Sequence, residues 1–275
     1  MQITPHVYNM HIDDDSPSHP GGSNNFFVGD PDLEMVIIDT GDYQRDWSAA
    51  IIDYHIDLGR PQISSILITH GHMDHIGGLD KIQEATNCVV RCHPLLRSSL
   101  AKLLGNDDIV IPLEDHEKIP LPGNFAIQAL YTPGHSLDHI CYHFAQDRVM
   151  FTGDTVLGAS STSVHDLRSY LKSLESLTKY DHDVICPGHG PVVPAPRGLN
   201  YIKKQIEHRQ AREDQIISVL QEGLLTVSEI ANAIYPKRLL VSLRSSAEKN
   251  VAAHLEKLVE DGRVNKELSS FTLRI

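Results

Sequence analysis

The sequence lacks the hydrophobic segments that would place it in or across a membrane. None of its apolar runs approaches the ~20 residues that a helix needs to span a bilayer. Its first residues show neither the basic start and apolar core of a signal peptide nor the arginine-rich composition of a transit peptide. These absences predict a cytoplasmic protein that has no membrane partner.

Cysteine is scarce and is not arranged as a disulfide framework. The 275-residue chain has four cysteines, at positions 88, 92, 141 and 186, and their spacing is not that of a disulfide-stapled domain. Cys88 and Cys92 could mimic a zinc-binding pair, but the other two fall in predicted strands. The pattern favours buried, reduced thiols and a reducing compartment.

Basic charge is also scarce over most of the chain. Residues 1–197 hold 12 lysines and arginines against 26 acids, whereas residues 198–275 hold 12 against 10. The net charge of −12 is therefore concentrated in the larger part. An acidic field of this kind disfavours a long polyanion such as RNA, although a local basic track can override it. The Gly-x-Ser-x-Gly motif is absent as well, so a nucleophilic serine is not indicated.

Histidine, in contrast, is clustered. Residues 70–75 (HGHMDH) offer four candidate metal ligands directly after the apolar run 63–69, which has the length of a buried strand. One catalytic zinc takes about three protein ligands, so four ligands in one loop indicate two metals that draw further ligands from elsewhere. The alternative is a solvated histidine-rich turn.

Three later segments supply such ligands in one shared layout. In each, an apolar run meets a glycine and a candidate ligand follows at once, which places His135, Asp154 and His189 after predicted strands. Glycine permits the sharp turn that aims such a side chain at a common centre. Asp39 ends an earlier run of the same shape, and we interpret it as a carboxylate that orients a ligand.

The remaining pattern predicts alternating strands and helices, which is typical of an α/β fold. Strands are predicted at residues 25–28, 35–38, 63–69, 89–90, 125–131, 140–144, 148–151 and 183–186, and helices at 45–58, 77–86, 93–105 and 164–179. Residues 13–22 have the composition of a loop. Three prolines and a glycine in residues 191–198 mark a boundary, so we expect a catalytic domain at 1–198 and a second domain at 199–275.

The second domain is predicted to be helical with a short hairpin. A long helix at 199–222 is followed by a helix that opens with the capping box Thr226 to Glu229, and by a third helix at 246–261. Residues 263–264 and 271–275 would pair as a wing. Lys249, Lys257, Arg263 and Lys266 could contact phosphates, but interleaved acids on the same helix make solvated faces the alternative interpretation.

The ordered ligands resemble those of the metallo-β-lactamase superfamily over about the first two hundred residues. The resemblance implies a four-layer αβ/βα sandwich with a small C-terminal winged-helix domain. It also implies a first metal held by His70, His72 and His135, a second held by Asp74, His75 and His189, and a bridging Asp154. The motifs at 131–139, 153–158, 187–191 and 206–209 resemble more closely the lactamase-like endoribonuclease group and its polyketide-releasing thioesterase relatives.

The resemblance and the ligand chemistry together predict a hydrolase with two divalent ions, for which Zn²⁺ is expected. A hydroxide bridging the ions would attack a carbonyl ester, thioester or lactone; the alternative is an endoribonuclease that cleaves single-stranded RNA. Asp74 is predicted to bind metal and to orient the hydroxide. His139 is either a proton donor or a structural support. A homo-oligomer is compatible with the sequence.

Overall fold

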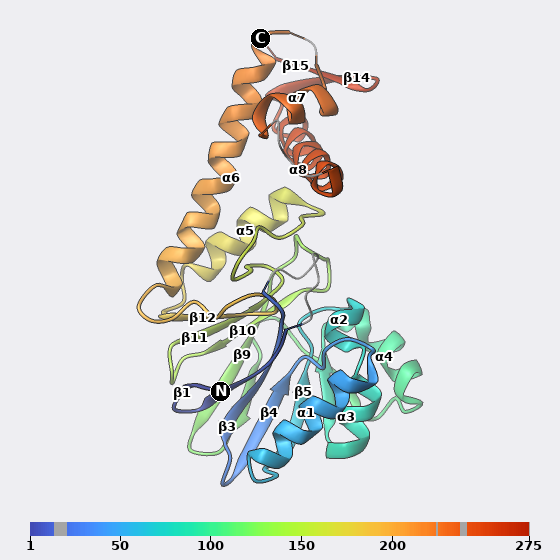
Figure 1. The fold of residues 1–275 in the computed structure, drawn as a ribbon, viewed down its shortest axis with the longest axis vertical. Helices are drawn as coiled ribbons and strands as arrows, with labels where there is room; N and C mark the ends of the chain where they lie inside the picture. The colour runs from blue at the N-terminus through green and yellow to red at the C-terminus, as the bar shows by residue number, and fades with distance from the viewer. Residues whose placement is uncertain (14–20, 224, 237–240, 275) are drawn as a thin grey trace.

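The structure, a computed structural model, describes residues 1–13, 21–223, 225–236 and 241–274, and it leaves out the side chains of residues 241–243. Two packed sheets with helices on their outer faces form the larger part, from which a long helix rises to a small helical part (Figure 1). Most of the predicted loop at 13–22 lies outside the described residues.

The first sheet has the strand order β1-β2-β3-β4-β5-β6-β7. Strands β1 to β4 pair antiparallel, and strands β4 to β7 pair parallel. The strands are β1 (Gln2–Thr4), β2 (Val7–Ile12), β3 (Ser23–Asp30), β4 (Glu34–Ile38), β5 (Gln62–Leu67), β6 (Val89–Cys92) and β7 (Val110–Pro112).

The second sheet has the order β12-β11-β10-β9-β8, and its single parallel pair is β11 with β12. Its strands are β8 (Lys118–Leu121), β9 (Phe125–Tyr131), β10 (Ile140–Phe144), β11 (Val149–Gly153) and β12 (Val184–Pro187). The predicted strands at 125–131 and 140–144 are therefore confirmed in full, whereas the short strands β7 and β8 lie outside every predicted strand.

Alternating side chains divide the interior into layers. Phe26 and Val28 of β3 point between the sheets, whereas Phe27 points to the helices on the outer face. This alternation follows from the two-residue period of a strand, whose two faces are both covered here. The outer face of the first sheet is covered by α1 (Arg45–Asp57), α3 (Leu79–Thr86) and α4 (Arg97–Leu104), and that of the second by α5 (Leu167–Leu177). The predicted four-layer αβ/βα sandwich is thereby confirmed.

The structure differs from the sequence prediction around the histidine cluster. The predicted strand 63–69 ends at Leu67, and the predicted helix 77–86 is shortened to α3. A one-turn helix, α2 (Met73–Ile76), precedes α3. It begins after His72, whose extended backbone, with φ −72° and ψ 148°, forms the N-cap. Two of the candidate ligands therefore sit on a helical turn and not on an open loop.

The C-terminal part is a winged helix. It follows α6 (Gly198–Leu220) and consists of β13 (Leu225–Thr226), α7 (Val227–Ile234), α8 (Val241–Glu260), β14 (Val264–Glu267) and β15 (Ser270–Leu273). The predicted capping box is present, since Thr226 Oγ1 accepts from the Glu229 amide and the Glu229 carboxylate accepts from the Thr226 amide. The wing pairs β14 with β15 antiparallel, as predicted.

The winged helix is joined to the sandwich by polar and apolar contacts. Arg168 of α5 forms ion pairs with Glu260 and Asp261 at the end of α8, at 3.0 Å and 2.6 Å. Ala253 of α8 enters the apolar core that contains Tyr170 of α5. The two parts therefore share a packed interface. No helix among the described residues has the length and apolarity required to cross a membrane.

The packing of α8 beside α6 buries a histidine that makes folding sensitive to acid. His254 on α8 is 1% exposed, and within the described residues its ring nitrogens have no hydrogen-bond partner. Burial, together with the nearby Arg209 and Arg212, lowers the pKa of His254 from 6.5 to about 3. The unfolded chain therefore takes up a proton below pH 6.5 that the folded chain does not, and stability falls as the pH drops.

We expect His254→Leu to remove this acid sensitivity. Relative to the variant, the wild type should lose up to about 1.4 kcal/mol of unfolding free energy per pH unit between pH 6.5 and about pH 4. Urea unfolding at several pH values, followed by circular dichroism, measures the difference. A difference between the two proteins that does not vary with pH would contradict the prediction.

Candidate metal centre

The candidate ligands all follow strand ends at one edge of the sandwich. His70 and α2 come after β5, His135 comes after β9, Asp154 comes directly after β11, and His189 comes after β12. Because these four strands end on the same side, the loops that follow them bring the candidate ligands together. All seven predicted ligands gather there in two groups.

The first group consists of His70, His72, His135 and Asp154. Their donor atoms lie within 4.8 Å of one another. His72 Nδ1 is 2.9 Å from His70 Nε2 and 3.1 Å from His135 Nε2, and His135 Nε2 is 3.5 Å from Asp154 Oδ2. Three imidazole nitrogens and a carboxylate oxygen therefore converge on one point, which is the donor set of a first-row dication.

The second group consists of Asp74, His75 and His189. Asp74 Oδ2 is 3.2 Å from His189 Nε2, and Asp154 Oδ1 is 3.4 Å from both His75 Nε2 and His189 Nε2. The two oxygens of Asp154 therefore face different groups. This geometry agrees with the bridging role that the family resemblance implies for Asp154.

Unsatisfied polar atoms show that the donor set fits a cation. His75 Nε2 and Asp154 Oδ1 are buried and make no hydrogen bond to any described residue. Buried donors and acceptors left in this way are costly, unless an ion or water completes them. A divalent cation would satisfy both atoms, because each can direct a lone pair toward it.

Electrostatics favour the same interpretation. Burial lowers the pKa of His70 and the neighbouring His75 lowers it further, so the ring of His70 is neutral and keeps a free lone pair. Burial would raise the pKa of Asp154, but the charge of the neighbouring His75 holds this pKa well below its usual range. Burial likewise opposes ionisation of Asp74, yet the hydrogen bond from His189 lowers its pKa. The carboxylates are therefore ionised and the site attracts positive charge.

Three histidines of the cluster are oriented by a hydrogen bond at Nδ1, the ring nitrogen that points away from the other candidate ligands. His75 Nδ1 is 2.7 Å from Asp39 Oδ2, His189 Nδ1 is 3.0 Å from Ser23 Oγ, and His135 Nδ1 is 2.9 Å from the Ser163 carbonyl oxygen. Such bonds fix the tautomer and leave the other nitrogen for a metal. Asp39 thus stands where the sequence interpretation put it, whereas Ser23 and Ser163 carry no local sequence signal.

His139 is enclosed by protein groups. It is fully buried, its Nε2 accepts from the Asp154 amide at 3.1 Å, and its Nδ1 is 2.9 Å from Thr132 Oγ1. Burial and the nearby His135 lower its pKa well below the usual range. Of the two roles predicted for His139, this geometry favours the support of Asp154 over proton donation to a substrate.

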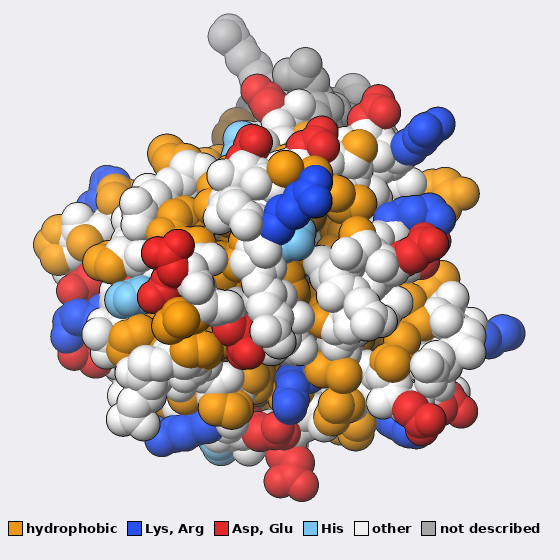
Figure 2. Space-filling model, turned by 90° about the horizontal axis from the view of Figure 1, so that it is seen from below, with side chains coloured by type: hydrophobic (Ala, Val, Ile, Leu, Met, Phe, Trp, Pro, Cys, Tyr) orange, Lys and Arg blue, Asp and Glu red, His pale blue; other side chains and the backbone are white. Residues whose placement is uncertain are grey.

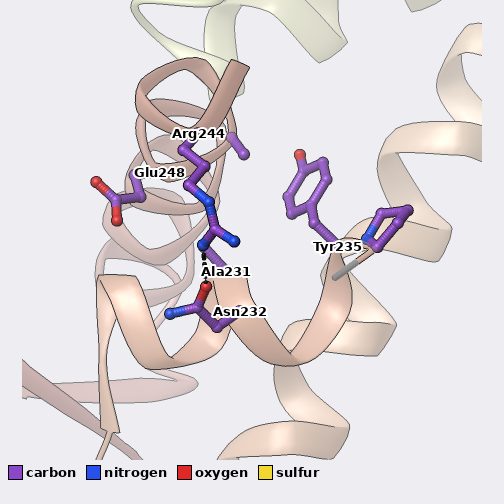
Figure 3. Close-up of a pocket in the computed structure, with 7 residues that line it drawn as sticks. Ala231, Asn232, Tyr235, Arg244 and Glu248 are labelled. Carbon is purple, nitrogen blue, oxygen red and sulfur yellow. Dashed lines mark hydrogen bonds between the residues drawn. The ribbon is translucent and has the colours of Figure 1, made fainter. Parts of the chain in front are cut away.

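Several cations of the winged helix are bound within the protein. Lys257 and Arg263 both pair with the buried Glu213 of α6. Arg244 donates to Asn232 Oδ1 at 2.7 Å, across a pocket between α7 and the start of α8 (Figure 3). Two of the four candidate phosphate contacts, Lys257 and Arg263, are thus engaged inside the chain. The structure favours the interpretation of this part as a packing unit.

A four-layer sandwich that gathers histidine and aspartate donors at its strand ends has the fold and the donor set of a candidate metalloenzyme. Residues 19–189 match the model of the metallo-beta-lactamase superfamily, and residues 226–270 match that of the beta-lactamase associated winged helix domain. The chain belongs to the metallo-β-lactamase superfamily.

Similar proteins include curated relatives and solved structures. An atrochrysone carboxyl ACP thioesterase of Cryptosporiopsis sp. (strain 8999) is 29% identical, over 97% of this chain and 84% of its own. A beta-lactamase-like protein 2 homolog of Caenorhabditis elegans is 30% identical, over 88% and 80%. A beta-lactamase domain protein from Burkholderia ambifaria has a TM-score of 0.82 at 19% identity, and it covers 100% of this chain and 93% of its own.

Gly153 gives a test of how tightly the centre is packed. Its φ is +44°, and an added Cβ would lie 2.8 Å from His139 Nε2 and 2.9 Å from Thr69 Cβ. Gly105, the C-cap of α4, has φ +66° but open space around it. We expect Gly105→Ala to cost about 1 kcal/mol of unfolding free energy through backbone strain alone. Gly153→Ala should cost at least about 2 kcal/mol, because steric overlap is added. Equal losses in chemical denaturation would contradict this prediction.

Proposed function

We propose that the protein hydrolyses a carbonyl ester, thioester or lactone with an apolar acyl part, at a centre of two divalent cations expected to be Zn²⁺. The convergence of the seven donor atoms in two groups around Asp154 supports this proposal. His70, His72 and His135 would hold one ion, Asp74, His75 and His189 the other, and Asp154 would bridge them. In this assignment residues 1–198 form the catalytic domain and residues 199–275 form a domain that shapes its surroundings.

Two bound cations would lower the pKa of a water toward ~7 and would polarise the carbonyl oxygen of the substrate. The residues of the chain orient the reactants. His72 is exposed and Asp74 is half-buried, whereas the other five donors are buried, so a substrate would approach over these two. The ionised Asp74 can accept a hydrogen bond from the attacking water and align it.

The segments that carry the donors, here called the mouth of the centre, expose apolar side chains and contain no lysine or arginine. Residues 36–44, 70–78, 132–139, 151–166 and 186–191 carry the donors and Asp39, and none of them is a lysine or arginine. Three of these segments expose large apolar side chains, with Tyr43 at 78%, Met73 at 58% and Leu137 at 72%. A phosphodiester backbone requires positive contacts, whereas an apolar acyl chain requires surfaces of this kind.

The end of the sandwich away from the winged helix carries charges of both signs. On the end of the sandwich drawn in Figure 2, acidic and basic side chains are interspersed and form no continuous basic track. The thioesterase names of several relatives also support a thioester. Cleavage of RNA is therefore the alternative outcome of the assay below.

Asp74→Ala tests the proposed function directly. We expect kcat/KM for acyl thioesters to fall by at least about a hundredfold with the fold retained, because a ligand and water-orienting group is lost. The assay compares aryl esters, acyl thioesters, lactones, bis-aryl phosphodiesters and single-stranded RNA, with a chelator-treated sample beside each. Asp80→Ala removes the same charge from the exposed surface of α3 and should keep wild-type rates. Unchanged turnover in Asp74→Ala, or activity on RNA alone, would refute the proposal.

Leu137→Ser tests the apolar mouth. Leu137 precedes Asp138, whose Oδ2 accepts from the Gly71 amide at 2.8 Å and so holds Leu137 beside the ligand loop. We expect KM for an octanoyl thioester to rise about three- to tenfold, and KM for an acetyl thioester to change little. Leu33→Ser is a matched control, since Leu33 is 56% exposed in the β3–β4 turn, at the opposite end of β4 from Asp39. An equal effect on both substrates would argue against acyl recognition there.

A further inference from the structure

The long helix α6 carries a buried arginine whose position the hydrolytic chemistry leaves unexplained. Arg209 is 3% exposed, and it belongs to the segment 206–209 that the sequence analysis singled out. No carboxylate of the described residues lies within ion-pairing distance of its guanidinium. Burying an unpaired guanidinium is costly, so the contacts it does make are informative.

Those contacts join three parts of the chain. Arg209 Nη2 donates to the carbonyl oxygen of Thr162 at 2.9 Å, in a fully buried bond. Nη1 donates to Asn250 Oδ1 on α8 at 3.4 Å. The guanidinium carbon also lies over the ring of Tyr170 on α5, 5.2 Å from its centroid. One side chain thus contacts the loop after β11, the helix α5 and the winged helix.

Thr162 and its neighbour orient a ligand of the first group. Thr162 Oγ1 is 3.0 Å from His135 Nδ1, and the Ser163 carbonyl oxygen is 2.9 Å from the same nitrogen. The opposite nitrogen of the ring, Nε2, points to His72 and Asp154. A shift of residues 162–163 would therefore rotate the His135 ring and misdirect its lone pair.

Residues 162–163 need an external support because they belong to no strand or helix. They lie between β11 and α5, and no strand pairing holds their backbone. Arg209 also packs on Tyr170, whose Cα is 2.4 Å from the place that a Cβ on Gly134 would occupy. Arg209 therefore contacts the carbonyl of Thr162 and also the ring of Tyr170, the residue whose backbone lies against Gly134, next to His135.

We propose that Arg209 is a positioning residue that holds His135 in the orientation of a metal ligand, and that Asn250 links the winged helix to the same support. This inference rests on the role of His135 as a ligand in the proposed function. In this proposal, contacts between the winged helix and the sandwich affect how tightly the first ligand group, which contains His135, binds its cation.

The test measures metal binding in the absence of substrate. Metal-free full-length protein is titrated with Co²⁺, and the visible spectrum reports each bound ion. We expect Arg209→Met to weaken one of the two binding steps about ten- to a hundredfold and to change its spectrum, as loss of a ligand-orienting bond does. Arg209→Lys serves if the methionine variant fails to fold, since it keeps the charge but loses the forked pair of donors. Asn250→Ala should produce a smaller loss at the same step.

Arg212→Met is the matched control. Arg212 lies one turn further along α6 and also stacks on an aromatic ring, that of Tyr235 at 4.1 Å. Its removal should leave both Co²⁺ affinities within about twofold of the wild type. A comparable loss in the Arg212 variant would overturn the inference, because the effect would then be a general one on the fold.

A double-mutant cycle with His135→Ala locates the effect. In that background Arg209→Met should cause no further loss of Co²⁺ affinity, since the ligand it positions is gone. An undiminished loss, or wild-type affinity in Arg209→Met itself, would overturn the inference. Failure of the proposed function would look different: the wild type would bind two Co²⁺ ions but hydrolyse none of the carbonyl substrates, while the effect of Arg209→Met on binding persisted.

Discussion

The architecture of the site depends on the concentration of negative charge at the seam between the two sheets. Asp39, Asp74 and Asp154 lie within one small volume, two of them buried, and imidazoles surround them. Burial lowers the pKa of His75, but Asp39 and Asp154 outweigh it and hold the pKa well above its usual value. The carboxylates therefore favour positive charge nearby, and a bound cation would supply it and leave the imidazoles neutral.

The parallel strand pairs explain why the donors meet. In the second sheet, β11 and β12 run parallel with Gly153 opposite Pro187, so Asp154 and His189 leave adjacent strand ends. In the first sheet, β4 and β5 run parallel with Ile38 opposite Leu67, which sets Asp39 beside Thr69. Antiparallel neighbours would send alternate loops to opposite ends of the sandwich. Each sheet therefore needs a parallel step to place two functional loops side by side.

The sequence predicts the parts of this arrangement that are encoded locally. His135, Asp154 and His189 each follow an apolar run and a glycine, so their place at a strand end could be inferred. The orienting groups could not, because Ser23 and His189 are 166 residues apart and only the fold brings them together. Nor could the helical turn α2, whose one-turn length gives no periodicity to detect. The ligands can therefore be predicted from local sequence patterns, whereas the residues that orient them cannot.

The distribution of cations has a consequence for substrate choice. The C-terminal part has more basic than acidic residues, yet Lys257 and Arg263 are bound to Glu213, and Arg168 of the sandwich is bound to Glu260 and Asp261. Positive charge here is therefore used to hold the C-terminal part together and, through Arg168, to fasten it to the sandwich. Because the donor loops add no lysine or arginine of their own, the attraction at the mouth comes from apolar surface and from whatever cations the centre binds. A substrate with a carbonyl group on an apolar chain would bind both the apolar surface and the cations. A nucleic acid would not bind the apolar surface in this way.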